Sequence, residues 1–234
     1  MKTLLIEAGN TRVKGAWLDN GEVIDLGTLQ LPELLDGLPP GRALLASVAG
    51  SAKNEALQST LHRFGWQVQP VVSEKQRFGV SSSYQFPEKL GVDRWLAMLA
   101  AYQQTAGACL VVDIGTAATA DLLSDNGQHL GGWIAPGLAL MQQSVLTHTA
   151  RVGDVAASCA IDFASDTGAA LTQGCQAMLR GFIHEAEKLA LQQLGKACPV
   201  LLSGGSGELL AVQQSAWQHR PLLVLEGLAL YASA

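Results

Sequence analysis

The sequence lacks the features by which several classes of protein are identified. It has no run of basic residues and no basic-aromatic stripe, and its net charge is -5, so we expect no nucleic-acid surface. No stretch approaches the roughly 18 consecutive apolar residues of a membrane span. The apolar run after Lys2 stops at Glu7, which is too short for the apolar region of a signal peptide. We therefore expect a cytoplasmic protein that binds neither nucleic acid nor a membrane.

Cysteine is scarce and is not spaced for metal binding. No two cysteines form a C-x-x-C pair, and no histidine cluster accompanies them. The four cysteines are Cys109, Cys159, Cys175 and Cys198. We interpret them as reduced thiols packed as small hydrophobic side chains, because disulfides and zinc sites need partners that this spacing does not supply.

What the sequence does contain is enough apolar material for a full core. Hydrophobic residues make up 48% of the 234 residues and charged residues 15%, which is typical of one large domain or two closely joined ones. In the first half, apolar runs and turn residues predict alternating strands and helices. The expected elements are strands at 3–8, 43–49 and 66–73, a hairpin at 12–29, helices at 52–65 and 93–104, and a loop at 75–89. Ser51 is the expected N-cap of the first helix and Gly65 its end.

The second half repeats the opening of the first. Residues 110–117, LVVDIGTA, match LLIEAGNT at residues 4–11, and Asp113 lies 106 positions after Glu7 (113 − 7 = 106). The hairpin signal Asp19-Asn20-Gly21 recurs as Asp125-Asn126-Gly127 at the same offset. We infer an internal duplication, and therefore an α/β protein of two similar lobes, residues 1–106 and 107–234, facing each other across a cleft.

Later segments predict further helices and a third glycine turn. Pro136-Gly137 opens a helix, and Ser165, Asp166 or Thr167 is expected to cap a long helix that runs to about Leu194. After it, residues 199–211 predict a strand, a glycine turn at Ser203-Gly204-Gly205 and a helix start.

The acidic glycine turns at the strand ends predict a phosphate site. Backbone N–H groups in such a turn converge on one spot and attract an anion, and Asn10, Thr11 and Thr116 add donors. A carboxylate beside phosphate makes sense if a cation lies between them, and Mg²⁺ prefers one or two carboxylates with phosphates and waters. Lys14 could neutralise further charge.

The alternative is that these are plain turns in which an Asp caps its own backbone. Two copies at one offset and a third glycine turn favour the phosphate site. Neither G-x-x-x-x-G-K-[ST] nor G-x-G-x-x-G is present, so the two common glycine-rich nucleotide motifs are excluded.

Six motifs follow one another along the chain: EAGNTRVK (residues 7–14), GVDR (91–94), DIGTA (113–117), GGWIAPGL (131–138), DT (166–167) and LSGG (202–205). In this order they resemble the type III pantothenate kinases, members of the actin-like ATPase superfamily with acetate and sugar kinases. They span nearly the whole chain, and the pair GVDR and DIGTA at this spacing is specific. The resemblance implies two ribonuclease-H-like lobes with mixed sheets flanked by helices.

The resemblance also implies a reaction: ATP phosphorylates pantothenate to 4′-phosphopantothenate, the first step of coenzyme A biosynthesis. It implies a homodimer, Mg²⁺ and a monovalent cation, K⁺ or NH₄⁺. The implied ATP-binding residues are Glu7, Ala8, Gly9, Asn10, Thr11, Arg12, Val13, Lys14 and Thr116. The implied pantothenate-binding residues are Tyr84, Gly91, Val92, Asp93, Arg94 and Thr167. Asp93 would be the general base, and Asp113 would coordinate the monovalent cation.

The residues themselves suit these roles, although each has a simpler interpretation. Asp93 begins a helix after a glycine, where a carboxylate can accept a proton, and the Arg94 fork matches a carboxylate. The simpler interpretation is a helix cap beside a solvent-exposed arginine. Tyr84 alone indicates no more than a loop anchor.

One position departs from the family pattern, which leaves other functions open. The first turn of the family usually opens with Asp, and here it opens with Glu7. The longer side chain moves the carboxylate outward, where positioning errors lower the rate. The alternatives are therefore a non-catalytic or regulatory, transcriptional accessory relative, and a kinase for another small hydroxylated substrate.

Overall fold

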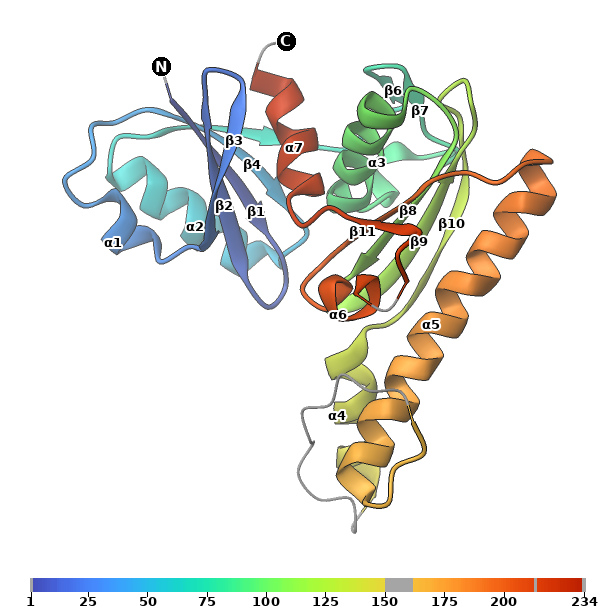
Figure 1. The fold of residues 1–234 in the computed structure, drawn as a ribbon. Coiled ribbons are helices and arrows are strands. Elements are labelled where there is room, and N and C mark those ends of the chain that lie inside the picture. Colours follow the sequence, from blue (N-terminus) through green and yellow to red (C-terminus); the bar gives the residue numbers. More distant parts are fainter. Residues whose placement is uncertain (1, 150–161, 213, 233–234) are drawn as a thin grey trace. The chain divides into compact units, whose positions relative to one another are not determined.

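The structure is a computed structural model, and it describes residues 2–149, 162–212 and 214–232. The chain divides into two compact units, Met1–Gln104 with Leu222–Ala234, and Thr105–Pro221. Each unit contains a five-stranded mixed sheet flanked by helices (Figure 1). Over the described residues, no helix combines the length and apolar character needed to cross a membrane.

The first unit is built on a sheet with the strand order β3-β2-β1-β4-β5. The strands are β1 (Thr3–Ala8), β2 (Val13–Asp19), β3 (Glu22–Thr28), β4 (Arg42–Ser47) and β5 (Gln67–Val71). The central strand β1 is antiparallel to β2 and parallel to β4, and the edge strand β3 is mostly exposed. Nearly every residue of β1 is buried, as expected for a continuous apolar run in a central strand that is covered on both faces.

Helices and a small hairpin complete the first unit. They are α1 (Leu31–Leu35), α2 (Ser51–Arg63), η1 (Pro87–Lys89), α3 (Val92–Thr105), α7 (Leu223–Ala229), η2 (Leu230–Ala232), β6 (Gln76–Arg77) and β7 (Val80–Ser81). Helix α7 packs against β1, so the segment from 222 onward belongs with the first unit. The sequence analysis places the boundary between the lobes at residue 106 and so predicts that this segment belongs to the second lobe. A helix that returns from the second half of the chain to the first sheet gives no local signal in the sequence.

The second unit has the sheet β10-β9-β8-β11-β12, with the same pattern of pairing as the first. Its elements are β8 (Cys109–Ile114), β9 (Ala117–Leu123), β10 (His129–Pro136), α4 (Leu138–His148), α5 (Thr167–Leu194), β11 (Val200–Ser203), α6 (Gly207–Ala211) and β12 (Trp217–His219). The equal strand order confirms the inferred duplication and the α/β fold class.

The two central strands match residue by residue in their burial. In β1 and in β8, every residue but the fifth is buried. That fifth residue is Glu7 in β1 and Asp113 in β8, so each carboxylate lies at the end of a central strand. Separate apolar cores cover the two sheets, one including Leu4, Ile6 and Leu45, the other Leu110, Val112 and Ile183.

Most predicted elements are confirmed, and the differences lie in caps and short pieces. The N-cap of α2 is Gly50, so the prediction of Ser51 was wrong, whereas Gly65, with φ of 79°, follows the helix end as expected. Asp166 caps α5, and its side chain accepts a hydrogen bond from Ala169 N, which excludes Thr167 as the cap. The expected loop 75–89 contains β6, β7 and η1.

The three cysteines in the described part of the chain are buried or half-buried free thiols. Burial raises the pKa of Cys109 to about 12, and burial also raises the pKa values of Cys175 and Cys198, so these side chains are protonated near pH 7. This confirms the interpretation for these three, while Cys159 lies outside the described residues.

Candidate active site

The first glycine turn joins β1 to β2 and consists of the four residues 9–12. Gly9 N donates a hydrogen bond to Arg12 O at 2.9 Å, and the side chains of Asn10, Thr11 and Arg12 are exposed. In the flanking strands, Glu7 lies opposite Lys14 and Ala8 opposite Val13. The predicted phosphate-binding residues 7–14 therefore form one continuous strand-turn-strand unit.

A lysine that the sequence analysis did not identify holds this turn. Lys53 of α2 donates from Nζ to Gly9 O at 2.8 Å and to Asn10 O at 3.0 Å. In a trans peptide, C=O and N–H point in opposite directions, and the structure has no cis peptide bond among its described residues. The N–H groups of Asn10 and Thr11 therefore point away from Lys53, as an anion-binding turn requires.

The second glycine turn joins β8 to β9 and has only two residues, Gly115 and Thr116. Gly115 N donates to Ala117 O at 3.0 Å, and Gly137 N donates to Thr116 O at 3.0 Å. A Cβ atom added to Gly137 would lie 2.1 Å from Gly115 O, so only glycine fits there. Thus the last glycine of the motif GGWIAPGL, Gly137, packs against the second turn.

The third glycine turn packs against the same strand end. Gly204 has φ of 88°, and a Cβ atom on it would lie 2.4 Å from the carbonyl carbon of Ile114. Ser206 N donates to Ile114 O at 3.1 Å. Two of the predicted glycine turns therefore meet beside Asp113 and Thr116 in the second unit.

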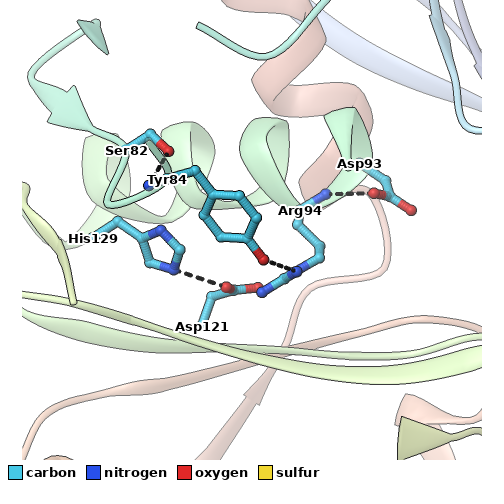
Figure 2. A network of polar contacts seen from close by, with 6 residues as sticks. All are labelled: Ser82, Tyr84, Asp93, Arg94, Asp121 and His129. Atoms are coloured by element: carbon cyan, nitrogen blue, oxygen red, sulfur yellow. Dashed lines mark hydrogen bonds and ion pairs between the residues drawn. The ribbon is translucent and has the colours of Figure 1, made fainter. Parts of the chain in front are cut away.

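The start of α3 in the first unit places Asp93 and Arg94 side by side (Figure 2). Asp93 Oδ1 accepts a hydrogen bond from Arg94 N at 2.8 Å. A Cβ atom on Gly91 would lie 2.5 Å from that same Oδ1, so the glycine makes room for the carboxylate. The helix N-terminus favours the ionised form of a carboxylate, which is the form a general base needs.

Arg94 is buried, and Tyr84 lies against it. Arg94 is only 7% exposed, so the simpler interpretation, a solvent-exposed arginine, is wrong. Arg94 Nη1 donates to Tyr84 Oη at 3.1 Å, and the guanidinium lies 5.9 Å from the centre of the Tyr84 ring (Figure 2). The structure therefore brings four predicted substrate-binding residues together in the first unit: Tyr84, Gly91, Asp93 and Arg94.

The two remaining predicted substrate residues, Val92 and Thr167, lie in different units. Val92 is buried and, together with Gly91, Ser47, Ser73 and other residues of the first unit, lines a cavity of about 300 Å³. Thr167 is the first residue of α5 in the second unit.

The sequence analysis did not identify several polar residues that make hydrogen bonds within the two units. Lys75 donates from Nζ to the carbonyl oxygens of Ser82 and Tyr84, and Ser73 Oγ donates to Leu90 O. In the second unit, Asp121 Oδ1 and His129 Nε2 form a buried pair at 2.9 Å, also drawn in Figure 2. No local signal marks such partners, because they are separated from one another by irregular spacings.

The donor set fits a cation that shares its ligands with phosphate. Among the described residues, no group of three or more His, Cys, Asp or Glu side chains could hold a metal ion by itself. Mg²⁺ does not need such a group, since it commonly takes one or two carboxylates together with phosphates and waters. Glu7 and Asp113 each supply one carboxylate at the end of a central strand.

Comparison with known proteins identifies the family. A sequence model described as type III pantothenate kinase matches residues 3–188. A type III pantothenate kinase from Pseudomonas fluorescens (strain SBW25) is 38% identical over 242 residues, covering 97% of each chain. One from Azotobacter vinelandii is 34% identical over 241 residues, covering 96% of each chain.

Solved structures share the fold at low sequence identity. A protein described as a Baf family transcriptional activator, from Campylobacter jejuni, superposes with a TM-score of 0.66 at 24% identity, with 98% of each chain covered. One described as a 2-dehydro-3-deoxygalactonokinase, from Sinorhizobium meliloti, gives 0.57 at 14% identity, covering 99% of this chain and 98% of that one. These likenesses show the fold alone, while the sequence matches show that this chain belongs to the type III pantothenate kinase family.

Proposed function

We propose that this protein transfers the γ-phosphoryl group of ATP to the 4′-hydroxyl of pantothenate, giving 4′-phosphopantothenate and ADP, the first step of coenzyme A biosynthesis. Membership of the family supports the reaction. The observation that carries it to particular residues is the grouping of Tyr84, Gly91, Asp93 and Arg94 at the start of α3.

Asp93 acts as the general base in this proposal. The hydroxyl oxygen of pantothenate forms a bond to the γ-phosphorus, the bond from that phosphorus to the β–γ bridging oxygen breaks, and the hydroxyl proton passes to the Asp93 carboxylate. Phosphoryl transfer has a loose transition state, so the main task of the protein is to align the hydroxyl and stabilise charge. The hydrogen bond from Arg94 N fixes the position of Asp93 Oδ1 at the start of the helix.

Arg94 and Tyr84 bind the rest of pantothenate. A guanidinium recognises a carboxylate through two parallel hydrogen bonds, and its burial strengthens that interaction. The phenol of Tyr84 limits the directions in which Arg94 can point, because it accepts from Nη1. Gly91 and Val92 line the cavity of the first unit, and Thr167, at the start of α5, is the further proposed substrate contact.

The two glycine turns hold ATP. Residues Glu7 to Lys14 supply backbone N–H groups and the Lys14 cation to the phosphates, and Thr116 supplies a hydroxyl. Mg²⁺, which would be held through Glu7 and the phosphates, neutralises phosphate charge when bound. Asp113 is proposed to coordinate the monovalent cation, K⁺ or NH₄⁺.

A homodimer in the cytoplasm is the proposed state of the enzyme. The family resemblance implies the dimer, and the second unit exposes apolar side chains that a partner could cover: Ile134, Leu140 and Met178 are 65%, 48% and 66% exposed. The cytoplasmic location follows from the proposed use of ATP. Light scattering after size-exclusion chromatography tests the dimer, since a monomeric mass at micromolar concentration would contradict it.

A coupled ADP-release assay tests the function. Wild-type protein with pantothenate, Mg·ATP and K⁺ is expected to turn over, and Asp93→Asn is expected to lower kcat about 100-fold or more, because a general base contributes roughly 10²–10⁴. Asp36→Asn, a matched change at an exposed carboxylate of the same unit, is the control and should leave kcat unchanged. A folded wild type that binds ATP but shows no pantothenate-dependent ADP release would instead favour the regulatory relative or a kinase for another substrate.

A further inference from the structure

Three consecutive residues of the first unit make hydrogen bonds next to the proposed pantothenate site. Ser73 Oγ donates to Leu90 O at 2.8 Å, directly before Gly91. Lys75 Nζ donates to Ser82 O at 3.0 Å and to Tyr84 O at 2.9 Å. Between them, Glu74 accepts a hydrogen bond from Tyr231 Oη at 2.6 Å. We call Ser73, Glu74 and Lys75 the anchor segment.

Tyr231 connects the anchor segment to helix α3. Its hydroxyl donates to Glu74 Oε1 and accepts from Trp95 Nε1 at 3.1 Å. Trp95 is fully buried and directly follows Asp93 and Arg94 in α3. One hydroxyl group therefore joins the residue before Lys75 to the residue after Arg94, so it fixes both sides of the Tyr84–Arg94 contact.

The ring of Tyr231 also holds the hairpin that leads to Tyr84. Phe78, at the hairpin tip, packs edge-on against Tyr231 with ring centres 5.2 Å apart. The guanidinium of Arg77 lies 5.0 Å from the Phe78 ring centre and 5.9 Å from that of Tyr231. Phe78 has φ of 47°, a conformation that non-glycine residues adopt only when neighbours hold it, and Gln103 Nε2 donates to its carbonyl at 2.8 Å.

Helix α7 leads into η2, which contains Tyr231. At one point α7 lies so close to α3 that a Cβ atom on Gly227 would be 2.0 Å from Leu96 O. Tyr231 itself is 8% exposed. Burial and the Glu74 carboxylate raise the pKa of Tyr231, so its hydroxyl keeps the proton that it donates.

We propose that Tyr231 is a positioning residue for pantothenate: through Glu74 and Trp95 it fixes the anchor segment against α3, and this sets the places of Tyr84, Gly91 and Arg94. The inference rests on the proposed function. It assigns a role in substrate binding to residues 222–232, which match none of the motifs of the family resemblance.

Tyr231→Phe tests the proposal, because it removes one oxygen and keeps the ring. It is expected to raise KM for pantothenate about tenfold, because losing one hydrogen bond to a charged group costs a free energy that corresponds to about that factor. KM for ATP should stay within twofold of wild type. The chain has three tyrosines, and Tyr102→Phe, which removes the same atom farther along α3, is the matched control. A pantothenate KM within twofold of wild type would overturn the proposal, as would equal rises in both KM values with a lower melting temperature.

Two further measurements test this proposal, and the second separates it from the proposed function. Glu74→Leu removes the acceptor of the Tyr231 hydroxyl. The double variant with Tyr231→Phe should therefore raise KM for pantothenate no further than the more severe of the two single variants. Amide hydrogen exchange without substrate should be faster over residues 82–95 in Tyr231→Phe and unchanged there in Tyr102→Phe. If the wild type does not phosphorylate pantothenate, the proposed function fails, while faster exchange would still show that Tyr231 holds residues 82–95 in place. Unchanged exchange in Tyr231→Phe would overturn the positioning role itself.

Discussion

The two glycine turns lie at equivalent ends of β1 and β8, in sheets of the same strand order, yet they are held by different means. The first is a four-residue turn with exposed side chains, and a lysine ammonium on two of its carbonyls fixes it. The second is a two-residue turn fixed by the close approach of backbone at Gly137 and Gly204. A duplicated motif can therefore keep its place in the fold while the force that holds it changes from charge to packing.

The largest effect should come from filling the space around the second turn. Gly204→Ala places a Cβ atom against Ile114 and forces a left-handed φ on alanine, so we expect the free energy of unfolding to fall by about 3 kcal/mol. Urea denaturation measures this. A loss below about 1 kcal/mol would mean that backbone packing does not fix the second turn.

Removing the carboxylate charge at the end of β1 or of β8 should change the ion dependence of kcat in different ways. Glu7→Gln and Asp113→Asn are each expected to lower kcat about 100-fold, because small errors in positioning carry costs of that order. The first variant should also need more Mg²⁺, and the second should lose its stimulation by K⁺. Titrations of both ions against kcat measure the difference, and identical ion profiles for the two variants would contradict the separate roles.

Loss of the hydrogen bonds from Lys53 to the first turn should change KM for ATP and leave KM for pantothenate unchanged. Lys53→Met releases the carbonyls of Gly9 and Asn10, so the amides that are proposed to bind the phosphates lose their orientation, and KM for ATP should rise about tenfold. Lys2→Met, which removes an exposed lysine paired with Asp19, is the control. An unchanged KM for ATP would show that the first turn keeps its shape without Lys53.

The smallest effect is expected at the first glycine of the chain. A Cβ atom on Gly9 would lie 3.3 Å from Arg12 O, an approach that a small shift relieves. Gly9→Ala should therefore lower the free energy of unfolding by less than about 1 kcal/mol. Thermal unfolding beside Gly204→Ala sharpens the comparison, and equal losses in the two variants would contradict it.

The fold could be predicted from the sequence where the signals were local. The apolar run at 3–8 and the turn at Asn20-Gly21, with φ of 50° and 88°, confirm the expected strand and hairpin. The repeat at an offset of 106 (113 − 7 = 106) predicted two like sheets because it preserved the order of strand, turn and hairpin. Helix α7 could not be placed, since packing against β1 decides its unit.

The candidate site was predictable only in part. The motif residues of the first turn form a strand-turn-strand unit and those of GVDR lie at the start of α3, but their roles remain predictions. The groups that orient them, Lys53, Ser73, Lys75 and Tyr231, act from positions with no shared motif or period. Long-range hydrogen bonds of this kind depend on the folded geometry, so no pattern in the sequence could identify them.

Identification of the product tests the central claim most directly. Pantothenate, Mg·ATP and K⁺ are incubated with the wild type, with Asp93→Asn and with Glu7→Asp, and the products are analysed by mass spectrometry and ³¹P NMR. We predict 4′-phosphopantothenate from the wild type and from Glu7→Asp, and about 100-fold less from Asp93→Asn. No phosphorylated pantothenate from a folded wild type, or an unchanged yield from Asp93→Asn, would contradict the account.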